Sequence, residues 1–357
     1  MFSIRFYRMF DIGREVDLSE LEEALTRSYA TARAGFVRVS PKSIIMEDPP
    51  LMIRMQPFRI ERDSKLVEFS VVARLYDVGV ISFCFICEEA GGDTAGLSRL
   101  AFLFPHQEGL SDYFVKYLMT LGELIRPHIR NFALNPDFYE DYTIFIAGSR
   151  DDSFDPVPLI LGDRTAIAPA LRQEILSNAH SYTREDLAVL AWDSTFLTDV
   201  EYPADIIDLI EYANVQVLEL RYYDQELSRQ MEKMYDDIEG AERLSQYSRM
   251  RRYHAIMSEL METQAEISET VEKVDNLIKV TEDVYYARVY ATALKVLRSG
   301  QWSESVNKKI SVIRENYTML SNEVRIQHSN FLEWIVIILI VIEIGFAGVG
   351  FFFNIHL

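Results

Sequence analysis

The stretch LVEFSVVARLYDVGVISFCFIC, Leu66–Cys87, decides the fold class. Its two runs rich in apolar and β-branched residues, Leu66–Leu75 and Val78–Cys87, are separated only by Tyr76-Asp77, and this spacing predicts a β-hairpin. Strands joined this tightly must be antiparallel, because a parallel pair needs a crossover of a dozen or more residues.

The flanking sequence extends this pattern over residues 1–200. Alternation at Phe2, Ile4 and Phe6 predicts a first strand, and Asp17-Leu-Ser-Glu20 predicts the start of a helix that runs to about Arg33. Further strands are predicted at Phe36–Val39, Ser43–Met46, Leu51–Met55, Tyr142–Ala147 and within Leu187–Phe196, and a helix at about Leu110–Ile129. We therefore expect an α+β domain over residues 1–200 rather than a doubly wound sheet.

From about Pro203 the sequence becomes helical, with little proline or glycine. Apolar residues recur at alternating spacings of three and four in three stripes, 220–238, 260–278 and 310–324, which predicts long coiled-coil-like helices over residues 201–330. We expect a hairpin that turns at Ser299–Trp302. The stripes are compatible with pairing within one chain or between chains.

The run Leu332–Phe353 is almost entirely apolar and predicts one C-terminal transmembrane helix over residues 331–353, followed by a short tail at 354–357. Trp334 would lie at the headgroup level. About fourteen apolar residues contribute about −4 to −8 kcal/mol, which outweighs about +3 kcal/mol for Glu343 near the centre. A buried core helix is the alternative.

The expected orientation follows from the flanking charges. Positive residues stay on the cytoplasmic side, and Lys308, Lys309, Arg314 and Arg325 precede the anchor. The N-terminus is expected to carry no signal segment, because Arg5 and Arg8 interrupt its apolar residues. The sequence thus predicts a single-pass, tail-anchored protein of a bacterial inner membrane with a cytoplasmic body, or of the mitochondrial inner membrane facing the matrix.

The charge is concentrated in the N-terminal domain. Of a net charge of −19, residues 1–219 hold −15, from 20 Lys and Arg against 35 Asp and Glu. An acidic domain repels the phosphates of nucleic acids, and we therefore expect no direct binding of nucleic acid.

No catalytic or metal-binding motif is recognisable. Cys84 and Cys87 have the Cys-x-x-Cys spacing, but an offset of three along a strand places the two thiols on opposite faces, so we expect core packing. Gly91–Gly96 is where phosphate-binding loops occur but lacks their spacing, and we expect a turn with Asp93 capping a helix. The six histidines are scattered. We expect no cofactor.

Three groups of residues are candidates for binding. Glu343, Gly345 and Gly348 are candidates for an intramembrane contact between copies of the chain, through a protonated carboxyl and close helix approach. A helix-face group can serve either to dock its helix on the domain or to recognise a partner, and consists of Glu211, Asn214, Glu219, Arg221 and Asp224. A basic group is a candidate for contact with anionic lipid headgroups, against a solvated helix face, and consists of Arg249, Arg251 and Arg252.

The segment Glu211–Asp224, together with Leu332–Glu343, resembles the "required for meiotic nuclear division" family, also called the Sad-interacting-factor family, over roughly Leu66–Phe353. The resemblance implies an inner-membrane protein that forms oligomers and supports organellar translation, without an established catalytic activity. This chain departs from the mitochondrial members in lacking a transit segment and their aromatic-rich strand.

These observations favour a non-enzymatic membrane scaffold, homo-oligomeric, that presents an acidic domain to protein partners. The alternative from another class is a membrane-tethered enzyme or ligand sensor with a pocket in residues 1–200. A polar pocket with convergent ionisable groups in that domain would favour the alternative.

Overall fold

The computed structural model divides the chain into two compact units, and each is described by itself. Unit 1 comprises Met1–Tyr223 and Thr270–Glu304, and unit 2 comprises Asp224–Glu269 and Ser305–Leu357. The structure describes residues 1–13, 15–26, 29–33, 44–45, 48–130, 132–198, 203–275, 279–280 and 284–355. Among the predicted strands, Phe36–Val39 lies outside these residues.

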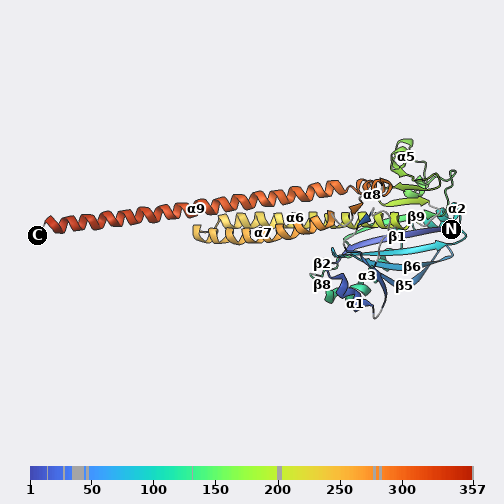
Figure 1. The fold of residues 1–357 in the computed structure, drawn as a ribbon, viewed down its shortest axis with the longest axis horizontal. Coiled ribbons are helices and arrows are strands. Elements are labelled where there is room, and N and C mark those ends of the chain that lie inside the picture. The colour runs from blue at the N-terminus through green and yellow to red at the C-terminus, as the bar shows by residue number, and fades with distance from the viewer. Residues whose placement is uncertain are drawn as a thin grey trace. The chain divides into compact units, whose positions relative to one another are not determined.

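Unit 1 is built on a nine-stranded sheet with the order β10-β11-β12-β9-β1-β7-β6-β5-β3 (Figure 1). The strands are β1 (Phe2–Asp11), β3 (Ala30–Arg33), β5 (Leu51–Arg62), β6 (Lys65–Leu75), β7 (Val80–Glu89), β9 (Tyr139–Ala147), β10 (Ala179–His180), β11 (Leu187–Leu190) and β12 (Ser194–Thr198). All neighbours are antiparallel except β12 and β9, which are parallel. Two short pairs lie outside this sheet: β2 (Glu15–Val16) with β8 (Ile129–Arg130), and β4 (Ile44–Ile45) with β13 (Lys279–Val280).

The predicted hairpin is confirmed as β6 and β7, which pair antiparallel from Leu75↔Ile81 to Ser70↔Ile86. The predicted α+β character of the N-terminal domain is confirmed as well. Leu187–Phe196 forms two strands rather than one, because the chain turns between β11 and β12, where Ala191 N donates to Ser194 O at 2.8 Å.

Strand β1 shows how the sheet separates two packed layers. Phe2, Ile4, Phe6 and Phe10 are buried in the larger apolar core, which also includes residues of α2 and α3. The helices that contribute to this core are α1 (Leu18–Leu25), α2 (Thr94–Ala101), α3 (Ser111–Ile125), α4 (Val157–Ile160) and α5 (Pro169–Leu176), with two 3₁₀ turns, η1 (Pro105–Gln107) and η2 (Arg126–His128). The alternate residues of β1 face the opposite side of the sheet, as the pleat requires.

The first part of α6 (Ala204–Glu242) belongs to unit 1 and lies against that opposite side. Its Tyr212 ring meets the Tyr76 ring edge to face at 5.5 Å, and both residues are buried. Helix α8 (Val284–Val296) also belongs to unit 1, where Thr292 Oγ1 lies 2.8 Å from His180 Nε2 of β10.

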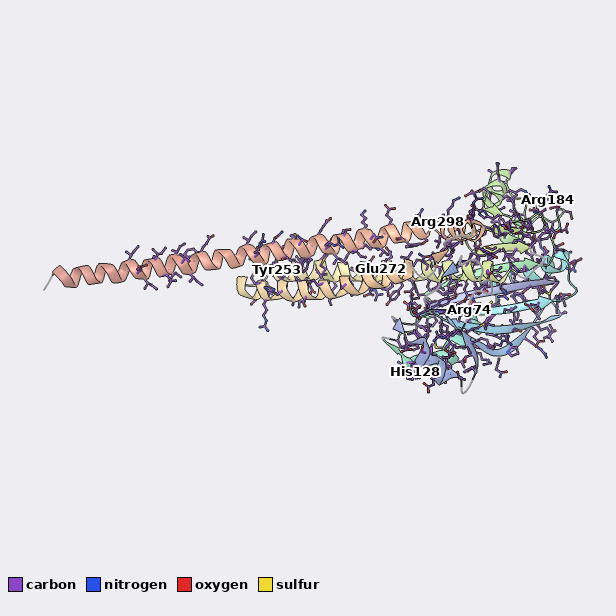
Figure 2. All side chains as sticks on the ribbon, in the orientation of Figure 1. Arg74, His128, Arg184, Tyr253, Glu272 and Arg298 are labelled. Carbon is purple, nitrogen blue, oxygen red and sulfur yellow. The ribbon has the colours of Figure 1, made fainter. Side chains whose placement is uncertain are left out.

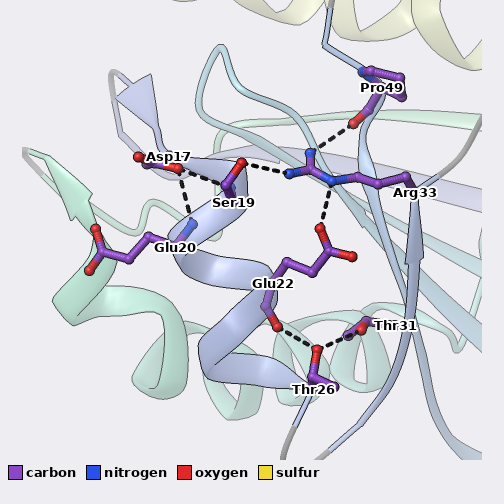
Figure 3. A network of polar contacts seen from close by, with 8 residues as sticks. All are labelled: Asp17, Ser19, Glu20, Glu22, Thr26, Thr31, Arg33 and Pro49. Atoms are coloured by element: carbon purple, nitrogen blue, oxygen red, sulfur yellow. Dashed lines mark hydrogen bonds and ion pairs between the residues drawn. The ribbon is translucent and has the colours of Figure 1, made fainter.

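Helix α1 begins where the sequence predicted it to begin. Asp17 is its N-cap and accepts hydrogen bonds from Ser19 N at 2.9 Å and Glu20 N at 3.0 Å. The predicted end near Arg33 is wrong, because the helix ends at Leu25 and the chain continues into β3. Arg33 of β3 instead ties that strand to α1, donating to Glu22 Oε2 at 2.8 Å (Figure 3).

Unit 2 consists of the second part of α6, most of α7 (Gln246–Asp275) and most of α9 (Ser299–Ile355). Buried apolar side chains of the three helices include Leu227 and Met234 of α6, Ile256 of α7 and Ile310 and Ile313 of α9. A turn between Glu242 and Gln246 joins α6 to α7. A second break separates α8 from α9, where Arg298 has a φ of +57°.

The predicted transmembrane helix is wrong. Among the described residues, no helix combines the length and the apolar character that are needed to cross a bilayer. The predicted tail-anchored arrangement and the predicted single-pass location in an inner membrane, bacterial or mitochondrial, are therefore wrong as well.

Candidate functional site

A cavity of about 110 Å³ lies in unit 1, where η1, β9, α4 and the turn between β11 and β12 meet. Its buried walls include apolar side chains, such as Phe104 and Leu159, and the polar Gln107, Thr143 and Ser194. Asp141 and Asp193 also line it, and their side chains are 40% and 33% exposed. The cavity is thus a small hollow of mixed polarity with two carboxylates that remain accessible to solvent.

The backbone is strained where η1 enters this cavity. His106 and Gln107 have φ values of +47° and +61°, a conformation that costs a non-glycine residue roughly 1–2 kcal/mol. The Gln107 amide offsets this cost, since its Nε2 donates to Tyr7 O at 3.0 Å and Tyr142 O at 3.1 Å on β1 and β9. Strain of this kind concentrates at functional sites, and here it projects His106 into the lining.

Gly162, just after α4, makes room for the His106 ring. Its φ is +63°, and a Cβ atom at this position would lie 2.9 Å from His106 Nε2. Glycine is therefore needed both for the backbone conformation and for the approach of the imidazole. On its other edge, His106 Nδ1 lies 3.9 Å from Asp193 Oδ2.

Both carboxyl groups are only partly compensated by positive charge. Burial raises the pKa of Asp193, with Asp141 adding to the rise and the Ser194 hydroxyl and His106 opposing it. Burial also raises the pKa of Asp141, which the Arg8 guanidinium opposes from 3.8 Å. Arg8 thus lies at the long limit of an ion pair with Asp141, and a closer positive group would stabilise the charged form of either carboxylate.

The geometry supports binding better than nucleophilic catalysis. Trp192 is 69% exposed and lines the cavity beside Asp193, so an aromatic face is available to a ligand. The buried Ser194 hydroxyl lies 2.8 Å from Ile160 O, which accepts its hydrogen bond, and 3.2 Å from Asp193 Oδ1. The 3.9 Å separation of His106 and Asp193 exceeds the roughly 2.6–3.2 Å needed for direct proton transfer.

A family model described as "Uncharacterized protein MJ0711, N-terminal domain" matches residues 1–204, more than half of the chain. The chain belongs to this family. Uncharacterized protein MJ0711 from the archaeon Methanocaldococcus jannaschii is 25% identical over 222 residues, which cover 59% of this chain and 66% of that relative. The alignment therefore spans just under two thirds of the relative's length. No solved structure matches the chain.

The family match includes every residue of the cavity described above and ends at the start of α6. The comparisons do not bear on the resemblance of Leu66–Phe353 to the Sad-interacting-factor family, which stays a prediction.

The predicted helix-face group begins in unit 1 with Glu211, which lies in a buried ionic network. Arg74 of β6 donates from Nη1 to Glu211 Oε2 at 2.8 Å and to Asp208 Oδ1 at 2.7 Å (Figure 2 labels Arg74). Burial raises the pKa of Glu211, against the opposing effect of Arg74. Glu211 Oε1 and the hydroxyls of Tyr76 and Ser82 have no hydrogen-bond partner of acceptable geometry among the described residues.

Asn214 and Glu219 are also buried, at 0% and 1% exposure. Asn214 Nδ2 donates to Ile210 O at 2.8 Å, and the oxygens Asn214 Oδ1 and Glu219 Oε1 have no partner among the described residues. Burial raises the pKa of Glu219 strongly, and the neighbouring Asp11 and Asp77 add to the rise.

The remaining two residues of the helix-face group lie in different units. Arg221 pairs with Glu140 of β9 in unit 1, and Asp224 accepts hydrogen bonds in unit 2 from Lys309 Nζ and Ser305 Oγ, each at 2.6 Å. The structure therefore encloses Glu211, Asn214 and Glu219 within unit 1 rather than presenting the five side chains together.

The other predicted sites lie in unit 2. Arg249 is half-buried on α7, Arg251 is exposed, and Arg252 pairs with Asp237 of α6. Glu343 is exposed on α9, whereas Gly345 and Gly348 lie outside the residues whose side chains the structure describes.

Cys84 and Cys87 are both buried on β7 and form no disulfide. Cys87 belongs to the larger core, whereas Arg5, Tyr7 and Glu211 on the other side of the sheet influence the pKa of Cys84, so the predicted opposite faces are confirmed. The predicted cap is also confirmed, since Asp93 Oδ1 accepts from Gly96 N at 2.7 Å. Within the described part of the chain, no three His, Cys, Asp or Glu side chains could hold a metal ion.

The cavity residues His106, Asp141 and Asp193 are not among the candidates that the sequence pattern indicates. They come from three distant segments, and none belongs to a recognisable motif. One signal was present, because Trp192-Asp193-Ser194 lies in the middle of an otherwise apolar segment and marks a turn.

Proposed function

We propose that unit 1 binds a small ligand that carries a protonated amine, with the ammonium group between Asp141 and Asp193. The observation that carries this proposal is the pair of under-compensated carboxylates that line a cavity of about 110 Å³ together with Phe104 and Leu159. This volume is somewhat below the roughly 150 Å³ of a cavity that admits benzene, so it suits a short aliphatic chain. The exposed Trp192 adds an aromatic face that attracts cations.

Among the functions expected from the sequence, this is the ligand-sensor alternative without its membrane tether. A binding role is favoured over an enzyme because the lining presents two carboxylates for recognition, whereas its Ser194 hydroxyl is buried and already donates to Ile160 O.

Replacing Asp193 by asparagine is expected to weaken binding of n-butylamine to the full chain about tenfold or more, since the substitution removes a charge-assisted contact. Isothermal titration calorimetry at pH 7.5 measures this loss. Asp152→Asn is the matched control, because the Asp152 side chain is 86% exposed and lies outside the cavity lining. Absence of butylamine binding to the unaltered chain would refute the proposal.

The same titration repeated at lower pH gives an independent readout. The pKa of both Asp141 and Asp193 is raised by burial from the ordinary value of 3.8, so both lose their charge at a higher pH than an exposed aspartate. Affinity for butylamine is therefore expected to decline on acidification before exposed aspartates titrate. Affinity that holds constant down to pH 4 would contradict the role of these carboxylates.

A second candidate function, assembly of several copies into a scaffold, is favoured by one observation in unit 2. Apolar side chains of α9 from Trp334 to Ile344 are 38–65% exposed, although Glu343 interrupts them. Contiguous exposed apolar surface of this kind marks interaction sites. A second copy of the chain would shield these side chains and would present the acidic domains together to a protein partner.

Ile338→Asp is expected to lower the oligomeric state, because an aspartate in an apolar contact between copies would be buried without a partner. Size-exclusion chromatography with light scattering measures the mass. Thr318→Asp places the same charge at an exposed polar position of the same helix and should leave the mass unchanged. A monomeric unaltered chain would exclude assembly.

A further inference from the structure

A second hollow in unit 1 adjoins the cavity. It is an open groove of about 620 Å³ between α2, the loop after β9 and α4. Phe102 and Leu159 line both the groove and the cavity, so the two form neighbouring compartments on either side of these residues. A ligand whose amine occupies the cavity can therefore extend over Phe102 and Leu159 into the groove.

The charges of the groove differ from those of the cavity. Arg99 and Arg164 line the groove, and neither forms an ion pair with any described residue. Arg164 Cζ lies 4.1 Å over the Phe102 ring, which holds this guanidinium at the boundary between the two compartments.

The two carboxylates that line the groove are already engaged. Asp155 Oδ2 accepts from Arg172 Nη1 at 2.6 Å. Asp151 Oδ1 accepts from Ser153 Oγ at 2.6 Å and from Ser153 N at 3.0 Å, and its Oδ2 accepts from Thr94 Oγ1 at 3.2 Å. Among the charged groups that line the groove, Arg99 and Arg164 are therefore the cations without an ion-pair partner among the described residues, and their planar donors match carboxylate and phosphate oxygens.

We propose that the ligand of unit 1 is an aminoalkyl oxyanion, whose ammonium lies between Asp141 and Asp193 and whose carboxylate or phosphate binds Arg99 and Arg164. This inference rests on the proposed function, because it assigns the amine to the cavity. It adds the chemical class of the other end of the ligand and two residues that determine specificity.

The test compares ligands that differ only at that end. Calorimetry with the full chain measures the affinity of n-butylamine, of ω-amino carboxylates of increasing chain length and of the matching aminoalkyl phosphates. The tightest member of either series is expected to bind about tenfold more tightly than butylamine, because it adds charge-assisted hydrogen bonds. In Arg164→Gln and in Arg99→Gln, the ratio of the butylamine dissociation constant to that of the tightest derivative is expected to fall towards one. Arg59→Gln, which changes an exposed arginine outside the groove, is expected to leave this ratio unchanged.

The outcomes separate the two proposals. If butylamine binds and every oxyanion derivative binds no more tightly, the groove assignment is overturned and the amine site stands. A tenfold ratio that persists in both arginine variants also overturns the groove assignment, because the anion would then bind elsewhere. If neither butylamine nor the derivatives bind, the proposed function fails and this inference fails with it. Circular dichroism spectra that match the unaltered chain establish that each variant is folded.

Discussion

Replacing Arg74 by methionine is expected to lower the free energy of unfolding of unit 1 by about 3–5 kcal/mol at neutral pH. Arg74 and its partner Asp208 are each 14% exposed, and Glu211 is 1% exposed. Without the guanidinium, Glu211 is left as an unpaired buried carboxyl beside Asp208. The loss should diminish on acidification, since protonation removes the uncompensated charge.

Chemical denaturation followed by circular dichroism measures the change, and hydrogen exchange of the β6 and β7 amides assigns it to unit 1. Arg59→Met is the matched control, because Arg59 pairs with Glu68 at a place where both side chains are more than half exposed. An exposed pair contributes at most about 1 kcal/mol. Equal losses in the two variants would contradict the structural role of the Arg74 network.

A double variant distinguishes the ionic interaction of Arg74 with Glu211 from the packing of the Arg74 side chain. Replacing Arg74 by methionine and Glu211 by leucine together removes the buried carboxyl as well as its counterion. Apolar replacement of both partners of a buried ion pair is often neutral or stabilising, so the double variant should recover the part of the loss that comes from Glu211, although Asp208 still lacks Arg74. Failure to recover would show that Arg74 acts through its other neighbours, among them Tyr76 and Tyr7.

The local pattern of the sequence was sufficient for the sheet but not for the cavity. Leu66–Cys87 predicts its hairpin because the hydrophobic period and the turn lie within 22 consecutive residues. The cavity depends instead on the strained backbone at His106 and on the parallel pairing of β12 with β9, which brings Ser194 opposite Thr143. A long-range pairing of this kind leaves no periodic signal in the sequence.

Burial of α6 was similarly hard to foresee from the helix alone. Glu211, Asn214 and Glu219 were recognised as unusual polar residues, but their environment is set by Arg74 on β6 and Asp11 on β1. The C-terminal segment was misassigned for a different reason. Leu332–Phe353 has the hydropathy of a membrane anchor as a run of sequence, but no described helix combines the length and the apolar character needed to cross a bilayer.

Replacing Glu219 by glutamine is expected to stabilise unit 1 by about 1–3 kcal/mol at pH 8 and to have little effect near pH 4.5. Glu219 is buried beside Asp11 and Asp77, and burial raises the pKa of Glu219 strongly and that of Asp11 to about 7. The folded state therefore holds protons that the unfolded chain releases at its ordinary carboxyl pKa of about 4. By linkage, these groups cost stability progressively as the pH rises from about 4 through 7.

Glutamine removes one of these carboxyl groups, and its amide can donate a hydrogen bond to the remaining carboxylate of Asp11. The stability of Glu219→Gln should consequently depend less on pH than that of the unaltered chain, with the two curves converging on acidification. Urea denaturation at a series of pH values measures both curves. Glu123→Gln, at an exposed position of α3, controls for the loss of one carboxyl and should shift the curve little. If Glu219→Gln is as sensitive to pH between 4.5 and 8 as the unaltered chain, Glu219 does not hold a proton in the folded state. The pH dependence would then have to arise from Asp11 alone.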